Sequence, residues 1–287
     1  MSGYRNIFES LEKQGVVIDP AYRESIEKRL NSVMSYQPRV GVFGKTGTGK
    51  SSLCNAVFGQ DVCKICDVAA CTRAPQEVIL SMGKNGIKLL DVPGIGESVE
   101  RDKEYGELYK NLLPELDIVL WVLKGDDRAF SSDEIFYKKL VRPYIDKGRP
   151  FFIVLNQVDK IEPFREWNEA TKMPGVKQAQ NIEEKRRSVA SIFDLPLTSV
   201  IAVSANERYG LIELVDNVVH SLPKDKKAIL LEEVKEENRS SSAKQEAKNG
   251  FWDTVIDIVT DIIPVAPVVK GVIKAGKAII EKIFSWW

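Results

Sequence analysis

The chain has 287 residues, which is enough for one large domain or two small ones. Lysine and arginine together number 41, as do aspartate and glutamate, so the formal net charge is zero. This balance argues against capture of nucleic acid or an anionic membrane by overall charge, although it allows a local basic patch. A hydrophobic fraction of 44% and a charged fraction of 29% exclude a largely disordered or low-complexity chain.

The sequence does not predict a membrane-spanning or secretory segment. The longest run without a charged residue, 195–206, has twelve residues and includes a proline, whereas a spanning helix needs about 20 apolar residues. The N-terminal segment carries Glu9, Glu12 and Lys13, which does not fit a signal peptide. Four cysteines are too few for a disulfide scaffold. We expect a cytoplasmic protein, with peripheral attachment to the inner membrane as the alternative.

Residues 1–38 are expected to form a helical N-terminal extension of two short helices. The second helix is the better defined, because Asp19 can cap it and Pro20 suits its first turn. Pro38 then ends the segment. The apolar stripe of this second helix consists of Tyr22, Ile26, Leu30 and Val33.

From residue 39 onward, short apolar runs alternate with amphipathic segments. The expected strands are 40–43, 78–82, 87–90, 118–123, 151–155 and 200–203. The expected helices are about 49–58, 101–113, 131–145, 180–193 and 210–221. This alternation predicts an α/β domain over 39–222, with a doubly wound, mostly parallel sheet covered by helices on both faces. Asn85-Gly86 is a hairpin signal, so the second and third strands should pair antiparallel.

Residues 223–287 divide into a polar part and an apolar part. Residues 223–250 are charge-rich and contain three consecutive serines, which predicts a helix that frays into a linker. Residues 251–287 hold three of the five tryptophans and predict an amphipathic helical hairpin, broken by Pro264 and Pro267. This hairpin can pack on the main domain, form a dimer interface or lie on a membrane surface. One arm carries Asp253, Asp257 and Asp261, and the other carries Lys270, Lys274 and Lys277.

A glycine-rich motif follows the first expected strand. It reads Gly44-Lys45-Thr46-Gly47-Thr48-Gly49-Lys50-Ser51, which matches G-x-x-x-x-G-K-[ST], and Ser52 continues it. Glycines let backbone N–H groups wrap around phosphates, and the following helix directs its positive end at them. Lys50 should neutralise the β- and γ-phosphates, and the Ser51 hydroxyl should bind Mg²⁺. We therefore predict a nucleotide-phosphate site over 45–52.

Three further polar segments follow expected strands. In Asp91-Val92-Pro93-Gly94, the carboxylate can hold the Mg²⁺ shell and the Gly94 N–H can meet the γ-phosphate. In Asn156-Gln157-Val158-Asp159, the Asp159 carboxylate can accept from guanine N1–H and N2–H₂, a donor pair that adenine lacks. In Ser204-Ala205-Asn206, the Ala205 N–H can donate to guanine O6. Because open α/β sheets bind ligands beyond the carboxyl ends of their strands, we predict a site for GTP or GDP.

With these motifs the chain resembles the Era-like P-loop GTPases, and specifically the bacterial YfjP/YkfA/YeeP group. The resemblance rests on GKTGTGKSSLCNAVFG, DVAACTR, LLDVPGIGE, LLPELDIVLWVLKGDDRAF and NQVD. It covers most of the chain for that group and about 39–222 for Era itself. It implies a G domain with a six-stranded sheet, one strand of which is antiparallel. It also implies that Thr72 is the switch I threonine, which closes on the γ-phosphate and joins Ser51 and Asp91 around Mg²⁺.

The sequence departs from the wider family at three positions. Gln157 stands where a lysine usually packs over the base and the phosphate loop, so weaker nucleotide affinity is expected. Gly47 replaces an asparagine that helps several Era relatives to bind potassium, which makes potassium activation doubtful. Ile95 replaces the water-orienting glutamine of Ras-type enzymes, so hydrolysis should be slow alone. Arg73, as an arginine finger, and Glu97, as a water ligand, are candidates to complete catalysis beside Lys50 and Thr72, but ordinary surface charges are the more favoured explanation.

Other clusters are weaker signals. Three thiols in the expected switch I segment, at Cys63, Cys66 and Cys71, fall short of the four ligands that Zn²⁺ prefers, and a redox-sensitive switch I is the alternative. Cys54 and Trp121 are expected in the core, and His220 at the end of a helix. A basic stretch is more typical of a solvated helix face than of an RNA contact; it consists of Lys138, Lys139, Arg142, Lys147 and Arg149.

Two functions therefore stay open. One is a GTP hydrolase that acts as a conformational switch, and the other is a nucleotide-dependent module for assembly or for recruitment to a membrane or ribosome, with negligible turnover. Besides a membrane or a ribosome, a second copy of the chain is an expected partner, in a homodimer formed through the G domain or the C-terminal hairpin. No recognition of DNA sequence is expected. A P-loop kinase of small metabolites is disfavoured, because it leaves Asp159 and Ser204-Ala205 unexplained.

Overall fold

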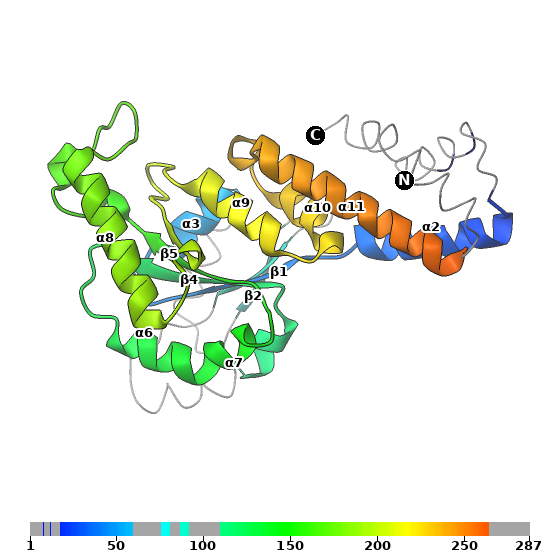
Figure 1. The fold of residues 1–287 in the computed structure, drawn as a ribbon, viewed down its shortest axis with the longest axis horizontal. Helices are drawn as coiled ribbons and strands as arrows, with labels where there is room; N and C mark the ends of the chain where they lie inside the picture. Colours follow the sequence, from blue (N-terminus) through cyan, green and yellow to red (C-terminus); the bar gives the residue numbers. More distant parts are fainter. Residues whose placement is uncertain are drawn as a thin grey trace.

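The computed structural model describes residues 18–59, 76–80, 87–91 and 110–263, together with Phe8 and Glu12 (Figure 1). Within this part of the chain, six strands form one sheet in the order β2-β3-β1-β4-β5-β6. The strands are β1 (Arg39–Phe43), β2 (Gln76–Leu80), β3 (Ile87–Asp91), β4 (Ile118–Lys124), β5 (Phe151–Asn156) and β6 (Val200–Ala202). All pair in parallel except β2 and β3, which form the expected antiparallel pair. The predicted α/β G-domain fold is thereby confirmed.

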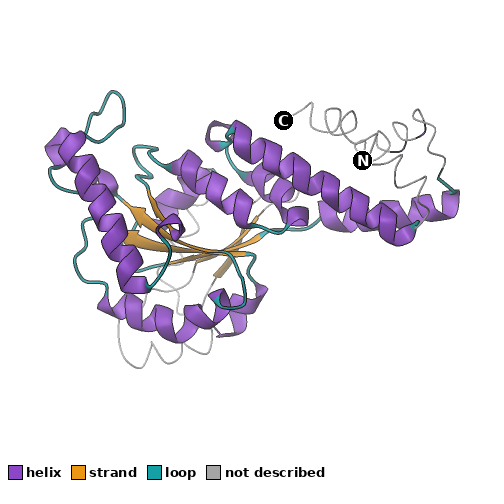
Figure 2. Cartoon of the chain, in the orientation of Figure 1, coloured by secondary structure: helices purple, strands orange, loops and turns teal. Residues whose placement is uncertain are grey.

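Helices cover both faces of the sheet (Figure 2). In β4, Ile118, Leu120 and Val122 face one layer, and the alternate side chains face the other. Both sets are buried, which explains why this strand is a continuous apolar run rather than an alternating one. The described helices are α2 (Pro20–Met34), α3 (Lys50–Val57), α6 (Ser131–Phe136), α7 (Arg142–Ile145), α8 (Val176–Phe193), α9 (Leu211–Ser221), α10 (Lys224–Glu233) and α11 (Ser241–Ile262).

Two helices differ from their predicted bounds. The segment expected as one helix over 131–145 contains a five-residue π-helix, Tyr137–Val141, between α6 and α7. Pro143 lacks the N–H that would continue the regular hydrogen-bond ladder, and this accounts for the local widening. Helix α8 begins at Val176 rather than at 180. Of the helix expected over 101–113, residues 101–109 lie outside the described part.

Residues 223–250, expected to fray into a linker, are packed helices instead. Helix α10 buries Ile229, Leu230 and Leu231, and α11 runs unbroken across the expected boundary at residue 250. Ser240 caps α11 by accepting a hydrogen bond from the Ala243 N–H at 2.9 Å. The contact side of α11 uses small residues, which allow α10 to approach closely but give little apolar signal in the sequence. A Cβ at Gly250 would lie 2.7 Å from the carbonyl oxygen of Lys224.

The acidic arm of the expected C-terminal hairpin packs on the protein as far as it is described. Figure 1 shows α11 beside α2, with both helices extending past the edge of the sheet. Asp261 on α11 pairs with Arg29 on α2 at 3.1 Å, and Asp257 pairs with Lys224 on α10. Phe251 and Val255 of α11 are buried in the core cluster that also contains side chains of β1 and β4. The basic arm, within 264–287, lies outside the described residues.

Across the described ranges, no helix combines the length and the apolarity needed to cross a membrane. Trp121 and Cys54 are buried in the core, as predicted. His220 lies in the last turn of α9, also as predicted, where its Nδ1 is 2.8 Å from the Asp216 carbonyl oxygen.

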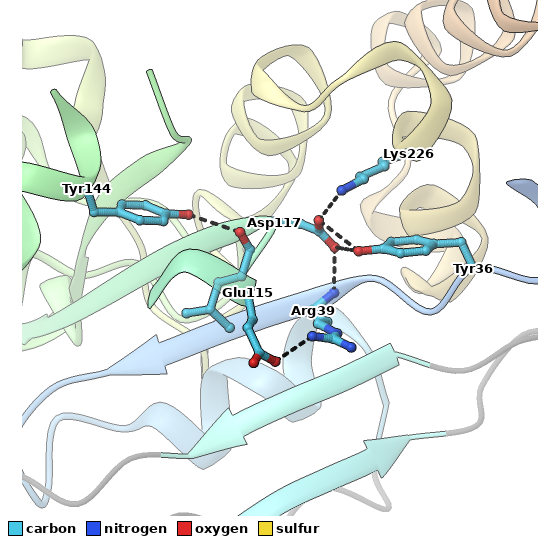
Figure 3. Close-up of polar contacts among 7 residues, drawn as sticks. Tyr36, Arg39, Glu115, Asp117, Tyr144 and Lys226 are labelled. Atoms are coloured by element: carbon cyan, nitrogen blue, oxygen red, sulfur yellow. Dashed lines mark hydrogen bonds and ion pairs between the residues drawn. The ribbon is translucent and has the colours of Figure 1, made fainter. Parts of the chain in front are cut away.

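A buried carboxylate joins the two terminal extensions to the amino-terminal end of the sheet (Figure 3). Asp117, which directly precedes β4, accepts hydrogen bonds from the Tyr36 hydroxyl at 2.9 Å and the Arg39 N–H at 2.8 Å. Lys226 on α10 forms an ion pair with the same carboxylate. Burial raises the pKa of Tyr36, and the negative charge of Asp117 adds to this effect. Burial by itself lowers the pKa of Lys226, but its hydrogen bond to Asp117 and their attraction outweigh burial and raise it.

Replacing Lys226 with methionine should lower the free energy of unfolding by roughly 1–3 kcal/mol, because a charged donor to a buried carboxylate is lost. Urea denaturation at pH 7 measures the difference. The raised pKa means that the stabilisation is complete below the unfolded-state value, about 10.4, and disappears as the pH rises through the folded-state value. The gap between the two proteins should therefore narrow above about pH 10.

Lys224→Met on the same helix is the matched control. Its ion pair with Asp257 has both side chains about half exposed, at 45% and 56%, so its loss should cost at most about 1 kcal/mol. Equal destabilisation by the two substitutions would contradict the assigned role of the buried network.

Candidate functional site

The glycine-rich motif forms a loop between β1 and α3. β1 ends at Phe43, and α3 begins at Lys50. Gly44, Gly47 and Gly49 have φ angles of 140°, 83° and 86°, which disfavour other residues. A Cβ on Gly44 would collide with the carbonyl oxygen of Val122 on β4, so the close approach of the loop to the sheet also requires glycine here.

The Lys50 ammonium lies against the inside of this loop. It donates to the carbonyl oxygens of Gly44 at 2.8 Å and Lys45 at 3.1 Å. Thr48 is buried, and its hydroxyl donates to the same Lys45 carbonyl at 2.9 Å. A cation held in a loop that precedes a helix N-terminus is an arrangement suited to binding phosphate.

The magnesium-binding residues predicted from the sequence are only partly described. Ser51 and Ser52 lie in the first turn of α3, partly exposed. Asp91 ends β3, and its Cα is paired in register with Val42, next to the last residue of β1. The backbone therefore places Asp91 at the carboxyl end of β3, beside the end of β1 where the glycine-rich loop begins. Thr72 lies outside the described residues.

Asn156 connects three of the predicted motifs. Its side-chain amide donates to the Thr48 carbonyl at 2.9 Å, and its Oδ1 accepts from the Ala205 N–H at 3.1 Å. Asn156 is 1% exposed, so these bonds are shielded from water. A Cβ on Gly49 would collide with the Asn156 amide nitrogen, which gives Gly49 a second reason to be glycine. The phosphate loop, the end of β5 and the loop after β6 are thus tied at one side chain.

Gln157, the residue that departs from the family pattern, also contacts the phosphate loop. Its side-chain amide donates to the Gly47 carbonyl at 3.0 Å, and its Oε1 accepts from the Lys160 ammonium at 2.8 Å. The glutamine therefore links the two loops itself, and Lys160 brings a positive charge beside it. The weaker nucleotide affinity expected from Gln157 stays a prediction.

The remaining guanine-motif residues lie close to this junction. Asp159 is half-buried in the turn Val158–Lys160 that follows β5. Ser204 is buried, and Asn206 is exposed beyond β6. The Ala205 N–H, expected to donate to guanine O6, already donates to Asn156. In this arrangement Ala205 positions Asn156, and a bond to guanine O6 requires this N–H to be shared or exchanged.

Gln178 is a residue of this site that the sequence analysis missed. It lies in the first turn of α8, is fully buried, and donates to the carbonyl oxygens of Asp159 and Ile161, each at 2.9 Å. It therefore supports the turn that carries the predicted guanine-binding carboxylate. The signal was hidden because the helix was expected to begin at 180, which left Gln178 in a loop.

Several predicted residues lie outside the described ranges and stay predictions. They are Thr72, Arg73, Gly94, Ile95 and Glu97, and the cysteines Cys63, Cys66 and Cys71. In the basic stretch, Lys138 pairs with Glu134 at 2.6 Å, and Arg142 pairs with Asp146 and Asp194. These pairs fit the predicted solvated helix face.

The chain is similar to known GTPases in sequence. A family model described as "50S ribosome-binding GTPase" matches residues 39–157. The chain is similar to YfjP of Escherichia coli K12, with 36% identity over 259 residues, covering 89% of this chain and 88% of that protein. It is also 36% identical over 252 residues to YkfA of the same organism, covering 88% and 85%. GTPase Era of Aquifex aeolicus is 28% identical over 188 residues, covering 64% of this chain and 56% of that protein.

Gln178→Met should destabilise the protein by roughly 1–3 kcal/mol, because two buried carbonyls in the turn after β5 lose their donors. Removal of the buried Oε1, which has no hydrogen-bond partner in the described structure, offsets part of this loss. Thermal unfolding gives the size of the effect, and hydrogen exchange at 158–161 should become faster.

Asn181→Ala provides the comparison for Gln178→Met. Asn181 on the same helix also donates to a backbone carbonyl, that of Glu162, but the bond is exposed. Its loss should cost less than about 1 kcal/mol and leave exchange at 158–161 unchanged. If hydrogen exchange at 158–161 in the Gln178→Met protein is no faster than in the unmodified protein, Gln178 does not hold this turn.

Proposed function

We propose a function from one established premise: this chain belongs to the Era-like P-loop GTPases, in the group that includes YfjP and YkfA. The proposal is that the protein binds GTP and GDP with Mg²⁺ and hydrolyses GTP to GDP and phosphate. Turnover is slow without a partner, and the switch loops report which nucleotide is bound. The chain covers 88% of YfjP and 85% of YkfA.

The observation that carries this proposal is the junction at Asn156. One buried amide at the end of β5 forms hydrogen bonds to both the phosphate loop and the loop after β6. A polar junction at the carboxyl ends of parallel strands is where an open α/β sheet binds a nucleotide. Asp159 lies in the next turn, Val158–Lys160, and the proposal assigns its carboxylate to the guanine base. A site for phosphate alone would not require these guanine-motif loops.

The residues present fit a magnesium nucleotide. Loop glycines with positive φ and the inward Lys50 ammonium suit the phosphates, and Ser51 and Asp91 are the oxygen donors that Mg²⁺ prefers. When bound, Mg²⁺ would neutralise negative charge on the β- and γ-phosphates. Lys50 would exchange its carbonyl partners for phosphate oxygens.

Slow turnover is proposed because Ile95 offers no polar group to orient water. Arg73 and Glu97 are the candidates in the chain itself, and a partner or a second copy is the alternative source. Recruitment to a membrane or a ribosome with negligible turnover is the competing function. A steady-state hydrolysis assay with and without lipid vesicles or ribosomes separates the two: turnover above the rate of a site-dead variant supports the hydrolase, and none in any condition supports the recruitment module.

Lys50→Ala should abolish measurable GTP and GDP binding, because it removes the cation held inside the phosphate loop. Titration with a fluorescent GDP analogue measures the affinity. The same protein serves as the site-dead variant in the hydrolysis assay. Micromolar affinity retained by this variant would overturn the assignment of the phosphate site.

Asp159→Asn should shift the base preference from guanine to xanthine nucleotides. Xanthine carries an oxygen where guanine carries N2–H₂, and the asparagine amide can donate to it. An unpaired buried group costs roughly 1–3 kcal/mol, so the preference for GDP over XDP should fall by about tenfold or more. Competition between GDP, XDP and ADP for the variant and for the unmodified protein measures this preference. In a separate titration, equal binding of ATP and GTP by the unmodified protein would show that the guanine assignment is wrong.

A further inference from the structure

A second lysine of the phosphate loop is held by a buried carboxylate. The Lys45 ammonium lies 2.6 Å from Oδ2 of Asp133, which is in the first turn of α6. The Asp133 side chain is 1% exposed, whereas that of Lys45 is 28% exposed. The other carboxylate oxygen accepts a hydrogen bond from the Trp121 indole N–H at 3.2 Å. A carboxylate this deeply buried is costly unless it is paired, so these two donors account for its presence.

The residues around Asp133 are buried aromatic side chains that pack on one another and connect directly to the loop. Trp121 on β4 stacks on Phe43 with ring centroids 5.9 Å apart and an angle of 8° between their planes. Phe43 is the last residue of β1 and directly precedes Gly44. Trp121 also packs against Phe136 on α6. The carboxylate is therefore fixed relative to the point where the phosphate loop leaves the sheet.

The backbone of Lys45 is where the loop holds Lys50. The Lys45 carbonyl accepts from the Lys50 ammonium at 3.1 Å, the Thr48 hydroxyl at 2.9 Å and the Thr48 N–H at 3.3 Å. Fixing the Lys45 side chain at Asp133 restricts the rotation of this residue, and so restricts the direction of that carbonyl. The position of the phosphate-binding lysine then depends on the ion pair outside the loop.

We propose that Lys45 and Asp133 form a clamp that positions the phosphate loop for the nucleotide phosphates. Lys45 is then a positioning residue that acts through the loop backbone, and its charge is directed away from the phosphates and toward Asp133. This inference rests on the proposed binding of guanine nucleotide at the same site. It assigns a role in nucleotide affinity to Asp133, which belongs to none of the sequence motifs.

The chain offers a matched control in Asp117, directly before β4. Asp117 is also almost fully buried, and it also pairs with one lysine, Lys226, and one aromatic donor, the Tyr36 hydroxyl. It contacts the amino-terminal end of the sheet and has no contact with the phosphate loop among the interactions described for it. Asp117→Asn therefore measures what the loss of a buried charge does to the fold alone.

The experiment compares GDP affinity and thermal stability in the full chain. Lys45→Met, Asp133→Asn and the double variant should each bind a fluorescent GDP analogue about tenfold more weakly, and the double variant no more weakly than either single one. Lys45→Arg, which keeps a cation for Asp133, should restore most of the affinity. Asp117→Asn should lower the melting temperature and leave GDP affinity unchanged.

Two results would overturn the clamp. If Lys45→Met weakens binding but Asp133→Asn does not, Lys45 contacts the phosphates directly. If both variants melt earlier but bind GDP like the unmodified protein, the pair is only structural. If Asp133→Asn does not fold, Trp121→Phe replaces it. This variant removes the indole donor that holds the Asp133 carboxylate and leaves Lys45 unchanged. The clamp predicts that it binds GDP more weakly than the unmodified protein. Failure of the proposed function is separate, because the unmodified protein and Asp117→Asn would then not bind GDP either.

Discussion

The buried amide of Asn156 is the interaction on which the geometry of the candidate site depends. It satisfies a carbonyl of the phosphate loop and an N–H of the loop after β6 from one position at the end of β5. Both partners are backbone groups, so the bonds fix the course of the two loops rather than single side chains. Because the junction excludes water, each of these bonds is worth more than its exposed equivalent, and an unmatched group there would be correspondingly costly. The requirement for glycine at position 49 follows from the same side chain.

Two buried carboxylates, Asp117 directly before β4 and Asp133 on α6 beside it, make similar contacts elsewhere in the domain. Asp133 receives the phosphate-loop lysine, and Asp117 receives a lysine from α10 and a tyrosine that precedes β1. The first couples the site to the helix layer formed by α6. The second couples the terminal extensions to the sheet. Asp117 thus fixes the start of β4, and Asp133 bonds to Trp121 in the middle of the strand, through contacts that only the folded chain can assemble.

The terminal extensions are part of the core layer rather than appendages. Leu30 of α2, Leu230 of α10 and Val255 of α11 belong to the same buried cluster as the side chains of β1 and β4. Ion pairs from Arg29 and Lys224 to α11 flank this contact. β1, whose side chains pack in this cluster, leads directly into the phosphate loop.

Much of the fold, and the position of the candidate site within it, could be predicted from the sequence, because both have local signatures. Apolar runs of strand length, the Asn85-Gly86 turn and the glycine-rich motif each involve neighbouring residues whose chemistry points to one structure. The strands and the antiparallel pair were found where these signals were strong. Residues 223–250 were misread because α11 packs through small residues, which carry no apolar periodicity. The π-helix was missed because the effect of Pro143 depends on how the chain relaxes around a lost hydrogen bond.

The sequence alone predicted which loops would carry phosphate and guanine chemistry, because motif, strand and helix are adjacent along the chain. Only the tertiary structure decided which side chains hold those loops in place. Gln178 and Asp133 belong to no motif, and nothing in the segment around Asp117 indicates its partners; each of the three acts on a backbone or side chain that is distant in sequence or lies on another element. No periodicity reports such a contact, because it depends on the register of the sheet and the packing of helices. The Ala205 N–H shows the same limit, since its bond to Asn156 follows from the position of β6 beside β5.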